Sequence, residues 1–434
     1  MKPVKIGICG LGTVGSGTFN VLGRNSAEIS ARAGTEIIIE QVGARRDNPA
    51  CDTSSANVTR DIFDVVRNPE VAVVVELIGG TTVAKQLVEE AIANGKHVVT
   101  ANKALIAEFG NELFAKAEAQ GVTIAYEAAV AGGIPIIKAL REGLSANKIE
   151  WLAGIINGTG NFILTEMRDK GRDFADVLKE AQELGYAEAD PTFDVEGIDA
   201  AHKLVILASI AFGMPLQFDK IFTEGISKIE PQDVTYANEL GYRIKHLGIA
   251  TKTEDGVVLR VHPTLIPEKR LIASVDGVMN AVLVKGDAVG PTLYYGPGAG
   301  AEPTASAVVA DIVDLARELA TGGKPNQAHL GFAADALQEF NMLPMSEVTT
   351  AYYLRMTAED RPGVLSKITQ IMSDKGISIE AVIQREPQNE GAQASIIMLT
   401  NRAQEKQLLA AISDIEALDT IEGSVTHIRV ESLD

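Results

Sequence analysis

The feature that most constrains this chain is a glycine-rich turn, Gly10-Leu11-Gly12-Thr13-Val14-Gly15, between an expected strand at residues 4–9 and an expected helix at 18–32. In such a turn the first glycine permits a tight reversal, the second lets a pyrophosphate approach the backbone, and the third lets helix and strand pack closely. The N–H groups at the start of the helix then favour the negative charge. The motif in this setting predicts a dinucleotide-binding turn, and the alternative is a glycine-rich turn that holds no ligand.

Strands and helices alternate after this turn. The run at 71–78 is almost entirely apolar and β-branched, as expected of a strand with helices on both faces of its sheet. This alternation predicts a Rossmann-like doubly wound parallel sheet filling residues 1–130. The further expected strands are 36–42, 97–100 and 122–125, and the further expected helices are 83–94 and 102–119.

The pattern changes at Gly132-Gly133-Ile134-Pro135. Residues 131–320 are expected to form an α+β catalytic and dimerisation domain, whose amphipathic helix at 304–319 packs back on the first domain. A linker is expected at 321–349, where glycine and proline are frequent. Residues 350–434 read strand, helix, strand, strand, helix, strand, which predicts a ferredoxin-like domain. The fold class is therefore α/β overall.

Composition excludes several classes of protein. The 434 residues carry 39 basic and 58 acidic side chains, a net charge of −19, which argues against binding to nucleic acid or to an anionic membrane. The longest apolar stretch, 205–216, has about half of the ~20 residues that a bilayer requires. Cys9 and Cys51 are too few to brace this chain and indicate a reducing compartment. The N-terminus lacks a signal-peptide pattern, so we expect a cytoplasmic protein.

The end of the second expected strand bears on cofactor choice. A site that prefers NAD usually places an acidic residue there, whereas this strand continues into Gly43-Ala44-Arg45-Arg46. Arg45 and Arg46 could hold a 2′-phosphate through charge-assisted hydrogen bonds, which favours NADP. The alternative is that both are solvated surface charges. Glu40 could serve an NAD ribose, so NAD remains open.

A stretch rich in acidic residues runs from Gly185 to Lys203. Asp199 and Lys203 are four residues apart and share a helix face. A surface ion pair is one reading, but the rest of this helix is nearly all apolar, and charges in a buried helix are costly unless paired or used. The other reading is a lysine held by carboxylates beside a bound substrate. An EF-hand calcium loop is rejected because it needs a glycine directly after its third ligand, whereas Gly197 lies three residues after Asp194.

These motifs together resemble the homoserine dehydrogenase family over residues 4–320. A second resemblance, over about 350–434, is to an ACT regulatory domain and rests on Asp360-Arg361-Pro362-Gly363-Val364-Leu365 after a strand. The residues that carry the first resemblance are Gly10 to Gly15, Leu77 to Gly80, Thr100 to Lys103, Glu127 to Pro135, Asn157-Gly158-Thr159, Ala181 to Lys203 and Gly296 to Gly300.

The first resemblance implies the NAD(P)-dependent interconversion of L-aspartate 4-semialdehyde and L-homoserine, a step towards threonine, methionine and isoleucine. It implies that Lys203 is the acid–base group and that Lys103 lies beside nicotinamide and substrate. Glu188, Asp199 and Asp194 would form the substrate-binding set, in which Glu188 and Asp199 bind the substrate's ammonium and Asp194 orients the lysine. The cofactor-binding residues that it implies, beside Arg45 and Arg46, are Gly10, Gly12, Thr13, Val14, Gly15, Lys103, Gly185 and Gly300.

Two further sites follow from the same resemblances. Glu127, Val130, Gly132 and Ile134 match a family site for a monovalent cation, usually sodium, and the alternative is a Gly-Pro hinge. In the ACT-like domain, the loop around Gly363 is a candidate effector site, with threonine as the family expectation and an inert packing domain as the alternative. Such domains often pair through sheet edges, so a homodimer or homotetramer is expected.

Two other functions stay open on sequence alone. One is another amino-acid semialdehyde dehydrogenase. Its phosphorylating form needs a catalytic cysteine, and neither Cys9, in a strand, nor Cys51, in an expected loop, suits that role. The other is a non-catalytic protein that senses amino acids.

Overall fold

A computed structural model describes residues 2–322, 328–385 and 393–434, and they form two compact units. The first unit comprises residues 1–158, 199–221 and 278–340, and the second comprises 159–198, 222–277 and 341–434. Within the described ranges, no helix is both long and apolar enough to cross a bilayer. The α/β class expected from the sequence is confirmed.

The first unit contains a six-stranded sheet in which every neighbouring pair is parallel. Its order is β3-β2-β1-β4-β5-β6, so the direction of winding reverses between β1 and β4, where doubly wound sheets bind their ligands. The strands are β1 (Val4–Cys9), β2 (Ile37–Gly43), β3 (Asn57–Thr59), β4 (Val73–Glu76), β5 (His97–Thr100) and β6 (Ile124–Ala125).

Helices cover both faces of this sheet, and one prediction about them is wrong. The single helix expected at 18–32 is two helices, which meet at Asn25; the second ends at Gly34, whose φ of 71° is left-handed. The first helix also begins earlier, inside the glycine motif. The helices are α1 (Thr13–Arg24), α2 (Ser26–Ala33), α3 (Ile62–Arg67), α4 (Thr82–Ala93) and α5 (Lys103–Gln120).

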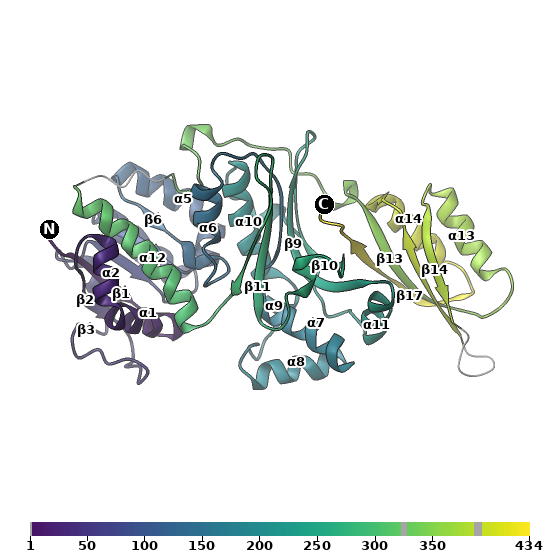
Figure 1. Ribbon diagram of the computed structural model, residues 1–434, viewed down its shortest axis with the longest axis horizontal. Coiled ribbons are helices and arrows are strands. Elements are labelled where there is room, and N and C mark those ends of the chain that lie inside the picture. The colour runs from purple at the N-terminus through teal and green to yellow at the C-terminus, as the bar shows by residue number, and fades with distance from the viewer. Residues whose placement is uncertain (1, 323–327, 386–392) are drawn as a thin grey trace. The chain divides into compact units, whose positions relative to one another are not determined.

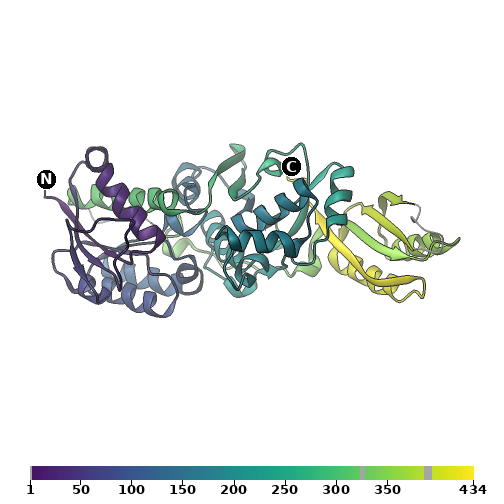
Figure 2. The same cartoon turned by 90° about the horizontal axis from the view of Figure 1, so that it is seen from below.

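Helix α12 (Ala301–Ala320) lies beside α1 and α2, far from them in sequence (Figures 1 and 2). Its buried face, including Val308 and Ile312, shares one apolar core with strands β1 and β4. The approach is close at Gly17, where a Cβ would lie 2.4 Å from the Ala301 carbonyl oxygen. An Arg24–Glu302 ion pair at 2.6 Å adds a polar contact at the rim.

The rest of the first unit combines short helical turns with an antiparallel sheet of order β12-β11-β7. The sequence of residues 136–144 predicts one helix, but this is wrong for a single α-helix, because the chain forms three α-helical residues and continues as a π-helix. Helix α10 is buried from Asp199 to its end. The elements are η1 (Glu127–Ala129), α6 (Ile136–Lys138), η2 (Ala139–Gly143), β7 (Ile149–Ile155), α10 (Ile198–Phe212), η3 (Phe218–Lys220), β11 (Met279–Gly286), β12 (Gly290–Pro297) and η5 (Ala334–Ala336).

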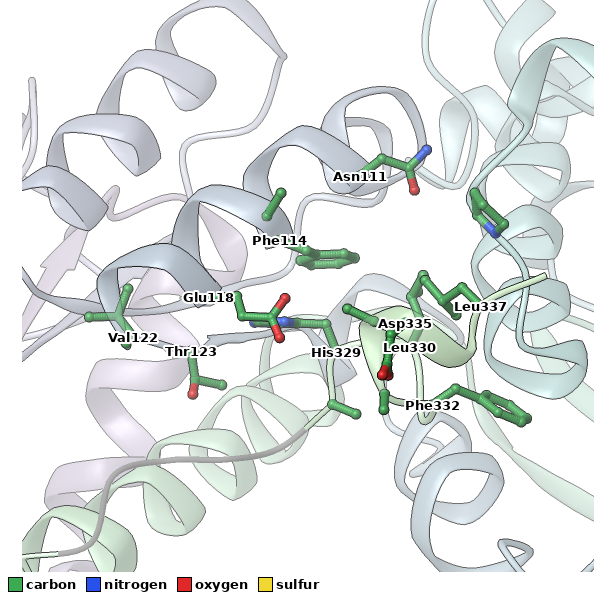
Figure 3. A pocket seen from close by; sticks show the side chains of 16 residues that line it. Asn111, Phe114, Glu118, Val122, Thr123, His329, Leu330, Phe332, Asp335 and Leu337 are labelled. Carbon is green, nitrogen blue, oxygen red and sulfur yellow. The ribbon is translucent and has the colours of Figure 1, made fainter. Parts of the chain in front are cut away.

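Residues 328–337 lie along the outer edge of the parallel sheet. The Ile124 N–H donates to His329 Nε2 at 3.1 Å, so an amide on edge strand β6 is satisfied. The His329 ring stacks on Phe114 at 4.6 Å between centroids. Phe114, Glu118 and His329 all line one cavity of about 1050 Å³, and Figure 3 shows these three side chains close together. The expected linker at 321–349 includes this segment, and its residues 323–327 lie outside the described residues.

The second unit contains a helical layer and a long antiparallel hairpin, β9–β10, that pairs over eleven residues. Strand β8 pairs in parallel with β10 at its other edge. The elements are α7 (Gly158–Lys170), α8 (Phe174–Glu183), α9 (Thr192–Val195), β8 (Phe222–Thr223), α11 (Pro231–Glu239), β9 (Tyr242–Lys252), β10 (Val257–Pro267), η4 (Leu271–Ser274) and η6 (Met345–Glu347).

The C-terminal part of the second unit has the expected βαββαβ order, with the spatial strand order β17-β13-β15-β14. Strand β17 also pairs in parallel with β10, so the two sheets of this unit are continuous (Figure 1). The elements are β13 (Thr349–Ala358), α13 (Val364–Asp374), β14 (Ile379–Gln384), β15 (Ala394–Thr400), β16 (Ala403–Gln404), α14 (Glu405–Glu416) and β17 (Ile421–Val430).

Candidate active site

The glycine turn has the geometry that close approach of a phosphate requires. Gly10 has a φ of +104°, and a Cβ there would lie 2.6 Å from the Leu77 carbonyl oxygen. A Cβ on Gly15 would lie 2.0 Å from the Gly10 carbonyl oxygen, so helix α1 can pack here only without a side chain. A Cβ on Gly12, by contrast, would meet no other atom of the described residues within 4 Å. The turn is closed on its inner side and open at Gly12.

Helix α1 begins directly at this opening. Its N-cap is Gly12, which has no side chain to accept from the first amides, and its first two residues are Thr13 and Val14. The N–H groups of a first helical turn have no partner within the helix, and they carry the positive end of its dipole. These residues therefore fit an anionic group such as a dinucleotide pyrophosphate.

The arginines after β2 are exposed and unpaired. Neither Arg45 nor Arg46 makes an ion pair with any residue that the structure describes. Their loop is tied to the glycine turn, because Asn48 Nδ2 donates to the Leu11 carbonyl at 2.7 Å. Glu40, left open as an NAD ligand, instead pairs with Lys5 at 3.0 Å.

Glu76, the last residue of β4, is a buried carboxylate beside the glycine turn that the sequence analysis did not single out. Its carboxylate is fully buried and accepts from the Ile78 N–H at 2.9 Å and from Thr100 Oγ1 at 2.6 Å. Burial raises its pKa above the ordinary value, although the hydrogen bonds act in the opposite direction. The signal available in the sequence was a carboxylate inside the otherwise apolar run at 71–78.

Asn102 connects that loop with α5. Its side-chain amide donates to the Gly80 carbonyl at 2.6 Å, and its oxygen caps α5 by accepting from the Leu105 N–H at 3.1 Å. Lys103 is the first residue of this helix. The two contacts fix the position from which the Lys103 side chain extends.

Asp199 bridges the two lysines that the sequence singled out. Its Oδ2 lies 2.7 Å from Lys203 Nζ, one turn along α10, and its Oδ1 lies 3.0 Å from Lys103 Nζ, on α5. Asn157 Nδ2 also donates to Oδ2, at 2.8 Å. Lys203 donates in turn to the Ile156 carbonyl at 2.7 Å. The i, i+4 pairing was expected, and the contact with Lys103 was not.

The electrostatics of the bridge hold Asp199 ionised. Burial pushes the pKa of its carboxyl upward, but the charges of Lys203 and Lys103 outweigh burial and leave that pKa well below its usual range. The Asp199 side chain is 5% exposed and that of Lys203 11%, whereas Lys103 is 33% exposed. One permanent negative charge therefore orients two amines, of which one is open to solvent.

The remaining acidic residues belong to the second unit, in what we term the acidic loop (residues 188–197). Gly185, just before it, has a left-handed φ of 75°; Glu188 is exposed and Asp194 is half-buried. Each oxygen of Asp199 lies within ion-pair distance of one lysine, and the orienting role expected of Asp194 stays a prediction. The substrate-binding assignments of Glu188, Asp194 and Asp199 stay predictions.

The candidate cation segment is a sharp bend in which Ala131 and Gly132 both have positive φ, 53° and 45°. The Glu127 carboxylate accepts from the Ile137 and Lys138 amides at 2.9 and 2.8 Å, so it caps α6. Burial, with the nearby charge of Asp311, raises its pKa to about 7.

Beside this carboxylate, backbone carbonyls of the bend are the ligands that a cation would find. That of Ile134 already accepts from the Ile136 N–H at 2.8 Å, while those of Val130 and Gly132 accept no hydrogen bond from a described residue. No group of three or more His, Cys, Asp or Glu side chains suited to a metal occurs in the described ranges. Gly300, with a φ of 121°, forms the N-cap of α12.

The loop between β13 and α13 encloses a pocket of about 340 Å³. Gly363 forms the N-cap of α13 with a φ of 92° and, like Gly12, would place a Cβ in open space. The lining residues are Glu359, Asp360, Arg361, Pro362, Gly363, Val364, Leu365, Gln384 and Ile396. The pocket coincides with the expected effector loop.

Comparison with known proteins accounts for nearly the whole chain. A family model described as Homoserine dehydrogenase matches residues 135–313, and one described as Homoserine dehydrogenase, NAD binding domain matches 10–127. A model of the ACT domain matches 352–419. The three matches follow one another in the order expected from the sequence.

Full-length relatives have the same extent. A homoserine dehydrogenase of Pseudomonas aeruginosa is 64% identical over 433 residues, covering 100% of both chains. The crystal structure of a homoserine dehydrogenase from Thiobacillus denitrificans superposes with a TM-score of 0.95 at 62% identity, over 100% of this chain and 99% of that one. A hyperthermophilic archaeal homoserine dehydrogenase in complex with NADPH has a TM-score of 0.63 at 26% identity and covers 75% of this chain and 100% of its own.

Proposed function

Because the chain belongs to the homoserine dehydrogenase family, we propose that it interconverts L-aspartate 4-semialdehyde and L-homoserine by hydride transfer with a nicotinamide dinucleotide. The chain is an NAD(P)-dependent oxidoreductase that carries an ACT domain. The observation that carries the proposed mechanism is the buried Asp199 carboxylate, with Lys203 at 2.7 Å and Lys103 at 3.0 Å.

The lysine bridge supports an acid–base role for Lys203. Reduction of an aldehyde builds negative charge on its oxygen, and a positioned ammonium stabilises that charge and delivers the proton. In the direction of alcohol oxidation the same amine must be neutral to accept the hydroxyl proton. Asp199 holds the amine in place in both directions, and Lys103 adds a second positive charge beside the reacting oxygen.

The residues that would hold the cofactor are those of the glycine turn and the loop after β2. A bound nicotinamide supplies or removes the hydride. The open space at Gly12 and the amides that start α1 support pyrophosphate binding there. The two unpaired arginines, Arg45 and Arg46, support a preference for NADP, as does the NADPH bound in the archaeal relative. NAD remains the second cofactor to test.

The role of Lys203 is tested by the Lys203→Ala variant in a coupled NADPH-oxidation assay with aspartate semialdehyde. We expect kcat to fall about 10²- to 10⁴-fold, the usual contribution of a general acid. The matched control is Lys85→Ala, which removes a lysine that pairs with Glu112 at 2.7 Å on the surface. Retention of most of the turnover by Lys203→Ala rejects the assignment.

The cofactor preference is tested by replacing Arg45 and Arg46 together with alanine. The KM for NADPH is expected to rise about tenfold or more, because two charge-assisted contacts to the 2′-phosphate are lost. The KM for NADH should stay the same. Arg32→Ala, which removes an exposed arginine paired with Glu28, is the control. Equal changes for both cofactors contradict the proposal.

We further propose that a sodium ion binds at Glu127, through its carboxylate, and at backbone carbonyls of Val130, Gly132 and Ile134, and that threonine binds the pocket beside Gly363 and inhibits the enzyme. The enzyme would act in the cytoplasm as a homodimer or homotetramer, in threonine, methionine and isoleucine synthesis. Activity with NADPH or NADH, with and without threonine, and in sodium or choline buffers tests the ligands. Light scattering tests the oligomeric state.

A further inference from the structure

The C-terminal end of the acidic loop, at Val195 and Glu196, is fastened by a neighbouring segment, residues 224–227, whereas its start is held by Gln182 of α8. The Ile226 N–H donates to the Val195 carbonyl at 2.9 Å, and Ser227 Oγ donates to Glu196 Oε1 at 2.8 Å. A Cβ on Gly225 would lie 2.2 Å from Glu196 Oε2 and 2.7 Å from the Val195 carbonyl oxygen. With no space left between the two segments, a displacement of 224–227 must displace the loop.

Glu224, the first residue of that segment, is fixed at both its backbone and its side chain. Its N–H donates to the Val261 carbonyl of β10 at 2.8 Å, and its carbonyl lies 2.9 Å from His246 Nε2 on β9. Its carboxylate accepts from Arg429 Nη1 at 2.8 Å. The backbone contacts come from the hairpin, whereas the side-chain contact comes from the C-terminal domain.

Arg429 belongs to β17, the last strand, and its side chain is 2% exposed. Its Nε donates to Glu405 Oε2 at 3.1 Å, its Nη2 contacts the other oxygen of Glu405, and the Tyr352 hydroxyl donates to Glu405 Oε2 at 2.7 Å. The guanidinium is planar, so fixing one edge on Glu405 fixes the direction in which Nη1 meets Glu224. Arg429 thus joins the core of the C-terminal domain to the segment that fastens the acidic loop.

We propose that Arg429 is a positioning residue for the acidic loop, acting through Glu224 and the backbone of residues 225–227. The inference rests on the proposed function, because Glu188 and Asp194 of this loop are predicted to contact substrate. It assigns to the C-terminal domain a standing contribution to substrate affinity, present without any effector.

The same contacts provide a route by which a ligand of that domain alters substrate binding. Tyr352 pairs with Arg429 across β13 and β17, and β13 continues to the Glu359 end of the 340 Å³ pocket. One strand therefore connects the pocket with the arginine, over roughly 20 Å. A ligand that shifts β13 along β17 would move the guanidinium and, with it, Glu224.

The test compares Glu224→Gln with a matched control, Glu431→Gln. Glu224→Gln removes the negative charge that pairs with Arg429. Because Arg429 keeps Glu405 as its counter-ion, we expect this variant to fold. The control removes an ion pair of the same kind, Glu431 with Arg260 at 2.6 Å, at the junction of the same two strands, β10 and β17. It leaves the contacts of residues 224–227 in place.

We expect Glu224→Gln to raise the KM for homoserine about five- to thirtyfold, with kcat within about twofold of wild type. Amide hydrogen exchange at residues 192–197 should become faster in this variant and stay unchanged in the control. Gly225→Ala, which pushes on the Val195 carbonyl directly, should raise KM in the same direction without changing any charge. Melting temperatures of all three variants check that the fold is kept.

Two results overturn the proposal. One is that Glu224→Gln keeps the wild-type KM and exchange rates, and the other is that Glu431→Gln shows the same rise in KM and the same faster exchange as Glu224→Gln. The second would show a general loosening of the β10–β17 junction. Failure of the proposed function is a separate outcome. If the wild-type chain does not oxidise homoserine, the exchange rates of the acidic loop in the two variants still decide whether Glu224 and Arg429 position it.

Discussion

Replacing Asp199 with asparagine tests the lysine bridge most directly. The carboxylate accepts from Lys203, Lys103 and Asn157, at 2.7, 3.0 and 2.8 Å. An asparagine has nearly the same shape but offers one acceptor oxygen, and its amide group would face an ammonium. The variant therefore keeps the packing and removes the charge that orients the two amines.

The expected magnitudes follow from burial. Breaking a buried ion pair costs about 3–5 kcal/mol, and the cost here falls to about 2–4 kcal/mol because Lys103 is 33% exposed and asparagine keeps one acceptor. We expect kcat to fall about 10²- to 10³-fold, since the acid–base amine loses its orientation. The lost negative charge also disfavours the protonated amine, so the rise of homoserine oxidation with pH should move to lower pH.

The assay is the pH profile of kcat for homoserine oxidation, with urea unfolding run in parallel. Asp276→Asn is the matched control, because Asp276 also bridges two cations, Lys245 and Arg168, each at 2.9 Å. The control should lose stability but keep kcat within about twofold. If Asp199→Asn keeps a third or more of the wild-type kcat with an unshifted profile, the bridge does not orient the acid–base group.

Three further outcomes are expected. Gly15→Ala should lower the melting temperature and abolish cofactor binding measured by nucleotide fluorescence, because its methyl group would lie 2.0 Å from the Gly10 carbonyl oxygen; unchanged binding would contradict the turn geometry. The pKa of His329 is lowered to about 4, chiefly by burial, so between pH about 6.5 and 4 the unfolded chain takes up a proton that the folded chain does not bind. The free energy of unfolding in urea should fall across that window, and in the His329→Gln variant this fall should be smaller by about 1–3 kcal/mol. An equal fall in the variant and the wild type would show that the buried contact of His329 with Ile124 is absent. Gly363→Val should weaken threonine binding in calorimetry by tenfold or more without changing kcat, because a φ of 92° disfavours valine and its side chain would fill the open space beside the pocket; full-strength binding would move the effector site elsewhere.

The local patterns of the sequence predicted strands and helices well where the spacing of apolar residues and the positions of turn-forming residues agree. The turn at Gly10 ends the strand expected at 4–9, and the apolar run at 71–78 contains strand β4, which is shorter than the run. The helix expected at 18–32 was wrong because apolar spacing continues through Asn25, where the backbone nonetheless breaks. Strands β9 and β12 were not placed individually, since their apolar residues follow no simple alternation and their hairpin partners set the register.

The candidate site shows the same division between local and distant contacts. The pairing of Asp199 with Lys203 follows from spacing along one helix, so it was predictable. The contact of Asp199 with Lys103 joins residues almost a hundred positions apart, and only the packing of α10 against α5 creates it. Arg429 was missed for this reason too: in the sequence it is one basic residue in a terminal strand, and its partners lie at 224 and 405.

Helix α12 has a consequence for how the chain matures on the ribosome. The apolar core around β1 includes Val308 and Ile312, so it is complete only when α12 has been synthesised. About 175 residues separate the end of β6 at Ala125 from the start of α12 at Ala301. At about 5–20 residues per second, the nascent nucleotide-binding domain waits about 10–35 s with one apolar flank uncovered. During that interval it is a natural client for a chaperone, and a chain truncated after β6 would emerge permanently in that state.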